Sequence, residues 1–141
     1  MYLDFEKMEL MFPETDYKSL NGLSLAFIGD AVYELFIRKY VLSKGEMTVK
    51  QLHNASIKYV NADFQADMAD FLADVFTEEE AAVFRRGKNS QPGHIPKNKS
   101  KSQYNKATGF EAVIGYLYLK KEYERLRYIF SLIMKKEEEN G

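Results

Sequence analysis

The chain has 141 residues, which is one domain's length, and its lack of cysteine excludes disulfides and thiolate metal sites. Its 20 basic and 21 acidic side chains nearly cancel, so the net charge by itself argues against a nucleic-acid-binding protein. The N-terminus is acidic where a signal peptide is basic, and no apolar run approaches the roughly 18 residues of a membrane span, so we expect a soluble, cytoplasmic protein.

Apolar residues recur every three or four positions along most of the chain, and strand-like alternation is missing. The sequence therefore predicts an all-α fold in a single domain over residues 1–141. A first short helix is expected at residues 5–11, before Pro13, and a long central helix at 23–42, ending near Gly45. Thr48 can cap the next helix through Gln51, and the apolar pattern continues through one or two helices to residue 76.

The second half of the chain contains three further predicted helices. Thr77 and Glu80 form a capping box that starts a helix ending at Gly87. Residues 88–102 include two prolines, a glycine and several polar residues, so we expect an exposed loop. Two helices at 103–120 and 122–138 follow, and the last residues are expected to fray.

Two carboxylates lie inside apolar segments that are predicted to be buried helices. Asp30 follows the run LAFIG, and Glu111 lies within TGFEAVIGYLYL. Burying an ionised carboxylate is costly unless it is paired, hydrogen-bonded or bound to a metal. For either acid alone, a local cap or ion pair is the simplest explanation. Both are explained together if their helices cross and the acids share a divalent cation with water and phosphate oxygens.

The segments around both acids resemble the two acidic motifs of ribonuclease III catalytic domains. LAFIGDAV, at 25–32, is similar to the segment in which an acid and then Phe-Leu-Gly-Asp open the central helix. ATGFEAVIGYLYL, at 107–119, is similar to the second motif, Asp-x-Phe-Glu-Ala-Leu-Ile-Gly. The order of the motifs and their separation agree as well. The resemblance covers nearly the whole chain and implies the helical bundle of that catalytic domain.

Two positions depart from the four acids of the family. Ala26 stands where the family has glutamate and Thr108 where it has aspartate, so only Asp30 and Glu111 match. The chain also stops without a C-terminal domain that binds double-stranded RNA. With these departures, and with the segments RRGKN at 85–89 and YNKATGFEA at 104–112, the sequence resembles the mini-ribonuclease III subfamily. That resemblance implies a cytoplasmic homodimer that trims the ends of precursor 23S ribosomal RNA.

The resemblance also implies a chemistry for the two acids. Asp30 and Glu111 are expected to bind Mg²⁺ and to catalyse the hydrolysis of double-stranded RNA to 5′-phosphate and 3′-hydroxyl products. With two matching acids, waters or substrate oxygens must complete the coordination, so we expect weak metal binding before RNA arrives. Glu34 is a candidate additional ligand, but an ion pair with Arg38, four residues on, is favoured. Phe27 stands where the family has a phenylalanine that inserts into the partner subunit, and a core position is about as compatible with the sequence.

Positive charge is concentrated in one part of the chain. Residues 81–110 contain no acid and seven of the twenty basic residues, which leaves thirteen basic against twenty-one acidic residues elsewhere. Double-stranded RNA is recognised by shape, through phosphates and 2′-hydroxyls, which suits such a surface. A solvated charge run is the alternative. The side chains predicted to contact RNA are Arg85, Arg86, Lys88, Lys97, Lys99 and Lys101.

The remaining features add no second chemistry. His53 and His94 lie in different kinds of segment and make no ligand pair, although His94 is a candidate for phosphate contact. Two other function classes stay open at this stage. One is a non-catalytic helical module for RNA binding or ribosome assembly, in which the lost acids mark a dead site. The other is a helical adaptor that binds only protein, for which the basic run is incidental.

Overall fold

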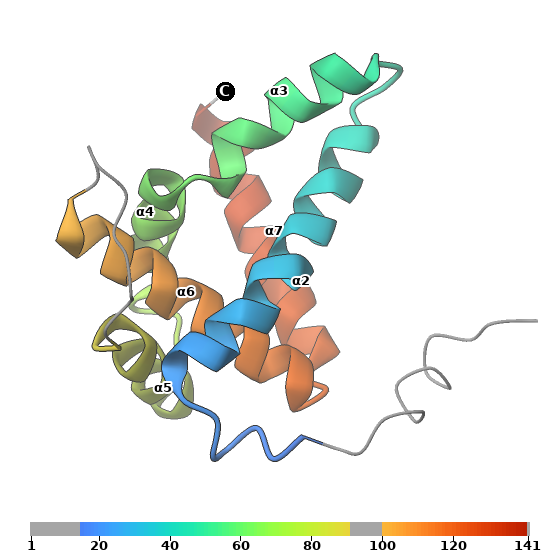
Figure 1. The fold of residues 1–141 in the computed structure, drawn as a ribbon. Coiled ribbons are helices and arrows are strands. Elements are labelled where there is room, and N and C mark those ends of the chain that lie inside the picture. The colour runs from blue at the N-terminus through green and yellow to red at the C-terminus, as the bar shows by residue number, and fades with distance from the viewer. Residues whose placement is uncertain (1–14, 91–99, 141) are drawn as a thin grey trace, which may run out of the picture.

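The computed structural model describes residues 15–90 and 100–140, which form six helices and no strand (Figure 1). This confirms the predicted all-α fold. The predicted helix at 5–11 lies outside the described residues, as do Lys97, Lys99 and His94. The helices are α2 (Gly22–Leu42), α3 (Val49–Val60), α4 (Ala62–Leu72), α5 (Glu78–Lys88), α6 (Lys101–Leu119) and α7 (Tyr123–Asn140).

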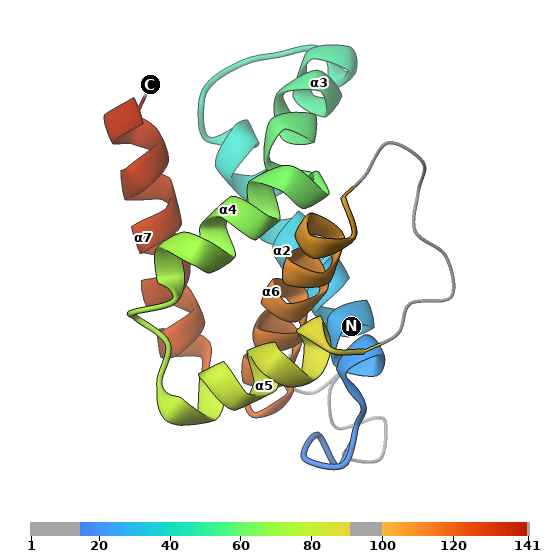
Figure 2. The same ribbon diagram turned by 90° about the vertical axis from the view of Figure 1, so that its left-hand side faces the viewer.

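Helices α2 and α6 cross at the centre of the molecule and make the most extensive contact in the fold (Figures 1 and 2). Helices α4 and α5 pack along α6, and α3 returns against α2. Helix α7 packs on α2 through the stacked rings of Phe36 and Phe130, whose centroids are 3.9 Å apart. The crossing of α2 and α6 therefore determines which side chains meet at the centre.

The capping predictions hold. Thr48 and Gln51 form a full capping box at the start of α3, and Thr77 and Glu80 do the same for α5. The apolar pattern after Thr48 divides into two helices because the Asn61 side chain ends α3 and starts α4. Its amide donates to the carbonyl of Ile57, and its oxygen accepts from the backbone of Phe64.

Several predicted helix ends were wrong by one or two residues, and two of the differences have a clear physical reason. Helix α5 continues through Gly87 to Lys88, because Gly87 packs on α6 and is part of the last turn; a Cβ there would lie 2.7 Å from the Cβ of Ala112. Helix α6 begins at Lys101 and not at 103. The Ser100 hydroxyl accepts a hydrogen bond from the backbone of Gln103 and so caps α6 two residues early.

Glu80 also ties two helices together from a buried position. Its carboxylate accepts two hydrogen bonds of 2.8 Å from the guanidinium of Arg125, which also donates to the carbonyl of Val75. Because this geometry satisfies both charged groups, the buried acid is structural and is not available for other chemistry.

Glycines allow the backbones of α2 and α6 to touch. A Cβ added at Gly29 would lie 1.7 Å from the carbonyl oxygen of Glu111, and one added at Gly115 would lie 2.0 Å from the carbonyl oxygen of Leu25. No larger residue fits at either position without separating the helices. The crossing therefore places the residue after Gly29 beside Glu111.

Candidate active site

The residue after Gly29 is Asp30, and the structure brings its carboxyl group to that of Glu111. The two side chains share a hydrogen bond between α2 and α6. Asp30 is exposed to solvent, whereas Glu111 is half-buried beneath it. Two acids separated by eighty residues in the sequence thus form one pair that faces open water.

The environment strongly favours a protonated Glu111. Burial raises the pKa of its carboxyl to about 9, and the hydrogen bond to Asp30 and the negative charge of Asp30 add to the effect. The neighbouring Gln65 amide opposes part of this increase. Burial and the charge of Glu111 also raise the pKa of the Tyr33 hydroxyl, which donates to the carbonyl of Tyr59. At neutral pH the Glu111 carboxyl is therefore protonated.

The donor atoms of this pair suit a hard divalent cation such as Mg²⁺, which takes carboxylate oxygens and keeps several waters. Within residues 15–90 and 100–140 there is no group of three or more His, Cys, Asp or Glu side chains that could enclose a metal ion. Ala26 is buried and apolar, and the Thr108 hydroxyl donates to the carbonyl of Tyr104 in its own helix. Ala26 and Thr108, the two positions that depart from the family pattern, therefore supply no further metal ligand.

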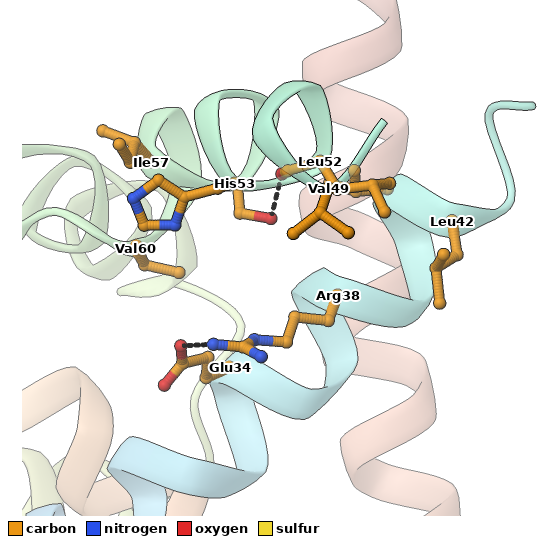
Figure 3. A pocket seen from close by; sticks show the side chains of 10 residues that line it. Glu34, Arg38, Leu42, Val49, Leu52, His53, Ile57 and Val60 are labelled. Carbon is orange, nitrogen blue, oxygen red and sulfur yellow. Dashed lines mark hydrogen bonds and ion pairs between the residues drawn. The ribbon is translucent and has the colours of Figure 1, made fainter. Parts of the chain in front are cut away.

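Glu34 is engaged in the ion pair that the sequence favoured. Its Oε1 lies 2.8 Å from Nη2 of Arg38, one turn further along α2. Glu34 and Arg38 line a groove between α2 and α3, and the exposed His53 lines it from α3 (Figure 3). The prediction of an ion pair is confirmed, and the histidine has no ligand partner in the groove.

One residue near the acids was not singled out from the sequence. Gln65, on α4, is 3% exposed and lies beside the Glu111 carboxyl. Its helical spacing could have identified it in the sequence. Gln65 is the polar residue on the buried face of α4, whose other members are Ala66, Met68, Ala69 and Leu72.

Phe27 lies on the outer side of α2, one turn before Asp30, and is 82% exposed. The alternative that it is a core residue was wrong. Leu35 and Leu42 continue the exposed apolar side of α2, and Val49 continues it on α3. Between the two helices lies an apolar groove of about 300 Å³ (Figure 3). This is a large amount of apolar surface for a chain that stands alone.

The predicted RNA-contacting residues that the structure describes lie at two helix ends. Arg85, Arg86 and Lys88 occupy the last turn of α5, and Lys101 begins α6; the two arginines and Lys101 are exposed. The end of α5 packs on the first turn of α2, since a Cβ at Gly22 would clash with the backbone of α5. Arg85, Arg86 and Lys88 therefore lie beside the start of α2, whereas Lys101 lies about two to three turns before Gly109 and Ala112, the part of α6 that Gly87 contacts.

None of the described helices is both long enough and apolar enough to cross a bilayer.

Comparisons with known protein families, proteins and structures agree on one family. Residues 23–122 match the family model described as the ribonuclease III domain. A Clostridium tetani protein named Mini-ribonuclease 3 is 47% identical over 131 residues, which is 92% of this chain and 87% of that protein. An Enterococcus faecalis protein of the same name is 42% identical over 86% of this chain and 93% of its own length. A crystal structure of a Fusobacterium nucleatum protein matches with a TM-score of 0.78 at 35% identity, covering 86% of this chain and 98% of that one.

Proposed function

This chain belongs to the ribonuclease III family, with relatives named Mini-ribonuclease 3, and we propose that it is a Mg²⁺-dependent endoribonuclease that cuts double-stranded RNA. The observation that carries the proposal is the Asp30–Glu111 pair at the glycine crossing of α2 and α6. A structural role explains this pair poorly. The contact with the Asp30 carboxyl opposes the ionisation of Glu111, and no basic side chain in the described part of the chain forms an ion pair with either acid.

In the proposed reaction Asp30 and Glu111 hold the cation, with Asp30 on the solvent side. A Mg²⁺ ion held by these two carboxylates would supply an activated water and stabilise charge on the leaving 3′ oxygen, and hydrolysis would give a 5′-phosphate and a 3′-hydroxyl. Glu111 must first release its proton, because burial and the contact with Asp30 keep its carboxyl protonated at neutral pH. The rigid glycine contact then keeps the two carboxylates at a fixed separation.

Cation binding is expected to strengthen as the pH rises toward about 9, the pKa of Glu111. Below that value the cation must displace a proton, so affinity should fall by up to about tenfold per pH unit, with about one proton released per ion. The groups facing Glu111 are Asp30, Gln65 and Tyr33, and neither Gln65 nor Tyr33 titrates in this range. Calorimetric Mn²⁺ titrations in two buffers of different ionisation enthalpy measure both quantities. An affinity that does not change between pH 7 and pH 9 would contradict the assignment.

RNA binding is proposed to depend on the cations at the ends of α5 and α6. Each phosphate contact should contribute about one unit of slope in a plot of log affinity against log salt. Arg85→Ala, Arg86→Ala and Lys101→Ala are each expected to weaken binding of a duplex RNA and to lower that slope, whereas Lys135→Ala on α7 should do neither. Fluorescence anisotropy with the Asp30→Asn variant measures binding without cleavage. Binding that is unaffected by salt would favour the adaptor that binds only protein.

We also propose that the protein is a homodimer, in which Phe27 packs against a second copy. Leu42 and Val49 are exposed and also line the groove between α2 and α3 (Figure 3). In the proposed dimer a two-fold axis places each Phe27 against the partner's groove. Such an arrangement would bring both acid pairs next to one interface, because Asp30 is one turn from Phe27.

Phe27→Asp is expected to yield a folded monomer. A charge at this position cannot be buried in the proposed interface, while the isolated chain already exposes the side chain to water. Tyr128→Asp, at an exposed aromatic position on α7, should leave the dimer intact. Light scattering after size-exclusion chromatography measures both masses. A wild-type protein that is monomeric at micromolar concentration would refute the homodimer.

The cleavage assay decides between the nuclease and its rivals. With Mg²⁺, a labelled duplex RNA should be cut to fragments with 5′-phosphates, while single-stranded RNA of the same sequence and a reaction with EDTA should stay intact. Intact duplex with retained binding would instead indicate the non-catalytic module.

We propose base-paired ends of precursor 23S ribosomal RNA, in the cytoplasm, as the natural substrate. This proposal rests on the resemblance to the mini-ribonuclease III subfamily. Accumulation of unprocessed 23S precursor in cells lacking the protein is the expected result.

A further inference from the structure

Three polar or charged side chains are buried in the described part of the chain, and two of them have an evident partner. Glu80 is bound by Arg125, and the Thr108 hydroxyl donates to the carbonyl of Tyr104. The third, Gln65, has an amide nitrogen, Nε2, for which no acceptor lies at hydrogen-bonding geometry. A buried donor without an acceptor destabilises a protein, so its presence calls for a reason other than packing.

The position of Gln65 supplies that reason. Helices α4 and α6 pack against each other, and the ion pair of Lys106 with Asp70, at 3.0 Å, joins them at one end. Gln65 lies five residues before Asp70 in α4 and comes opposite Glu111, five residues after Lys106 in α6, so its amide approaches that carboxyl without reaching full hydrogen-bonding geometry. Around Glu111 the chain therefore offers a second carboxylate from α2 and a neutral donor from α4.

We propose that Gln65 is a positioning residue for the cation: its Nε2 donates a hydrogen bond to the ionised Glu111 carboxylate and fixes the direction in which that carboxylate faces the ion shared with Asp30. The inference rests on the proposed function. With two protein carboxylates, the orientation of each one matters more to cation affinity than it does in a site with four acids. Groups that orient a ligand in this way are known to change metal affinity by about 10–100-fold.

The test compares Gln65→Met with Asn105→Leu. Methionine keeps the length of the side chain and removes the donor. Asn105, on α6, also carries a buried polar atom without a partner, its Oδ1, and so serves as the matched control. Gln65→Met is expected to weaken Mn²⁺ binding about 10–100-fold, measured by electron paramagnetic resonance titration. Its melting temperature should be unchanged or higher, because an unpartnered buried amide has been removed. Asn105→Leu should leave Mn²⁺ affinity unchanged.

A second measurement distinguishes weaker binding of the cation from a general loss of catalytic activity or RNA binding. The Mg²⁺ concentration that gives half-maximal duplex cleavage should rise with Gln65→Met, while saturating Mg²⁺ restores the wild-type rate and duplex affinity does not change. Mn²⁺ affinity equal to wild type, or a loss that Asn105→Leu reproduces, would overturn the positioning role and leave the nuclease in place. A wild-type protein that neither binds Mn²⁺ nor cuts duplex RNA would instead refute the proposed function, and the role of Gln65 with it.

Discussion

Asp30→Asn is expected to reduce duplex RNA cleavage by more than about 100-fold, since even residues that only orient a metal ligand cost 10–100-fold when they are replaced. The amide keeps the size of the side chain but cannot supply the negative charge that the cation needs. Asp30 is exposed, so the substitution leaves no buried group unpaired and the fold should persist. Cleavage rates at saturating Mg²⁺, with duplex binding as the control, measure the effect. A variant that cuts at more than a tenth of the wild-type rate would exclude Asp30 from the site.

Glu111→Gln should match this loss of activity and also change stability in a way that depends on pH. The unfolded chain releases the Glu111 proton near 4.5, whereas the folded protein retains it up to about 9. Between these values the folded state binds more protons, so the free energy of unfolding of the wild type decreases as the pH rises. The amide does not titrate and escapes this decrease. Melting temperatures should therefore shift in favour of Glu111→Gln between pH 6 and pH 9, and a shift in favour of the wild type would contradict the raised pKa.

Local sequence signals predicted most of the helices because helix caps act over three or four residues. The Thr48 and Thr77 capping boxes and the apolar periodicity needed no tertiary information. Two of the errors in helix ends had different causes: Ser100 is a local cap that the sequence analysis missed, whereas Gly87 extends α5 through a tertiary contact with α6. The all-α class followed from these signals alone.

The candidate site was predicted in part. Asp30 and Glu111 could be identified because an acid in an apolar helix is costly, and that cost is visible in the sequence. Gln65 was missed, since a neutral amide in a helix carries no comparable signal until its burial is known. Phe27 could not be assigned for a similar reason: an aromatic residue at helical spacing reads as core, and only its exposure in the folded chain distinguishes it.

Gly29→Ala is expected to destabilise the protein by about 4 kcal/mol or more, which is beyond the range of most single substitutions. In the middle of an exposed helix the same change would stabilise by up to about 1 kcal/mol, because alanine favours the helix more than glycine does. Here the added carbon would lie 1.7 Å from the backbone oxygen of Glu111, and no side-chain rotation can relieve a contact with backbone. Whether Gly29→Ala stabilises or destabilises the protein therefore shows whether the backbones of α2 and α6 touch at Gly29.

The same substitution tests whether the crossing builds the site. Any variant that remains folded must separate α2 from α6, which moves Asp30 away from Glu111, so cleavage and Mn²⁺ affinity should fall together with stability. Gly115→Ala, with its 2.0 Å approach to Leu25, should behave in the same way. Gly45→Ala is the comparison: its φ of +126° costs about 1–3 kcal/mol in strain, but no atom lies within 4 Å of the new carbon. In urea unfolding and duplex cleavage, Gly45→Ala should therefore be less stable than the wild type but fully active. Gly29→Ala and Gly115→Ala should lose both stability and cleavage activity. Activity retained at Gly29→Ala would mean that the two acids do not need this contact to act together.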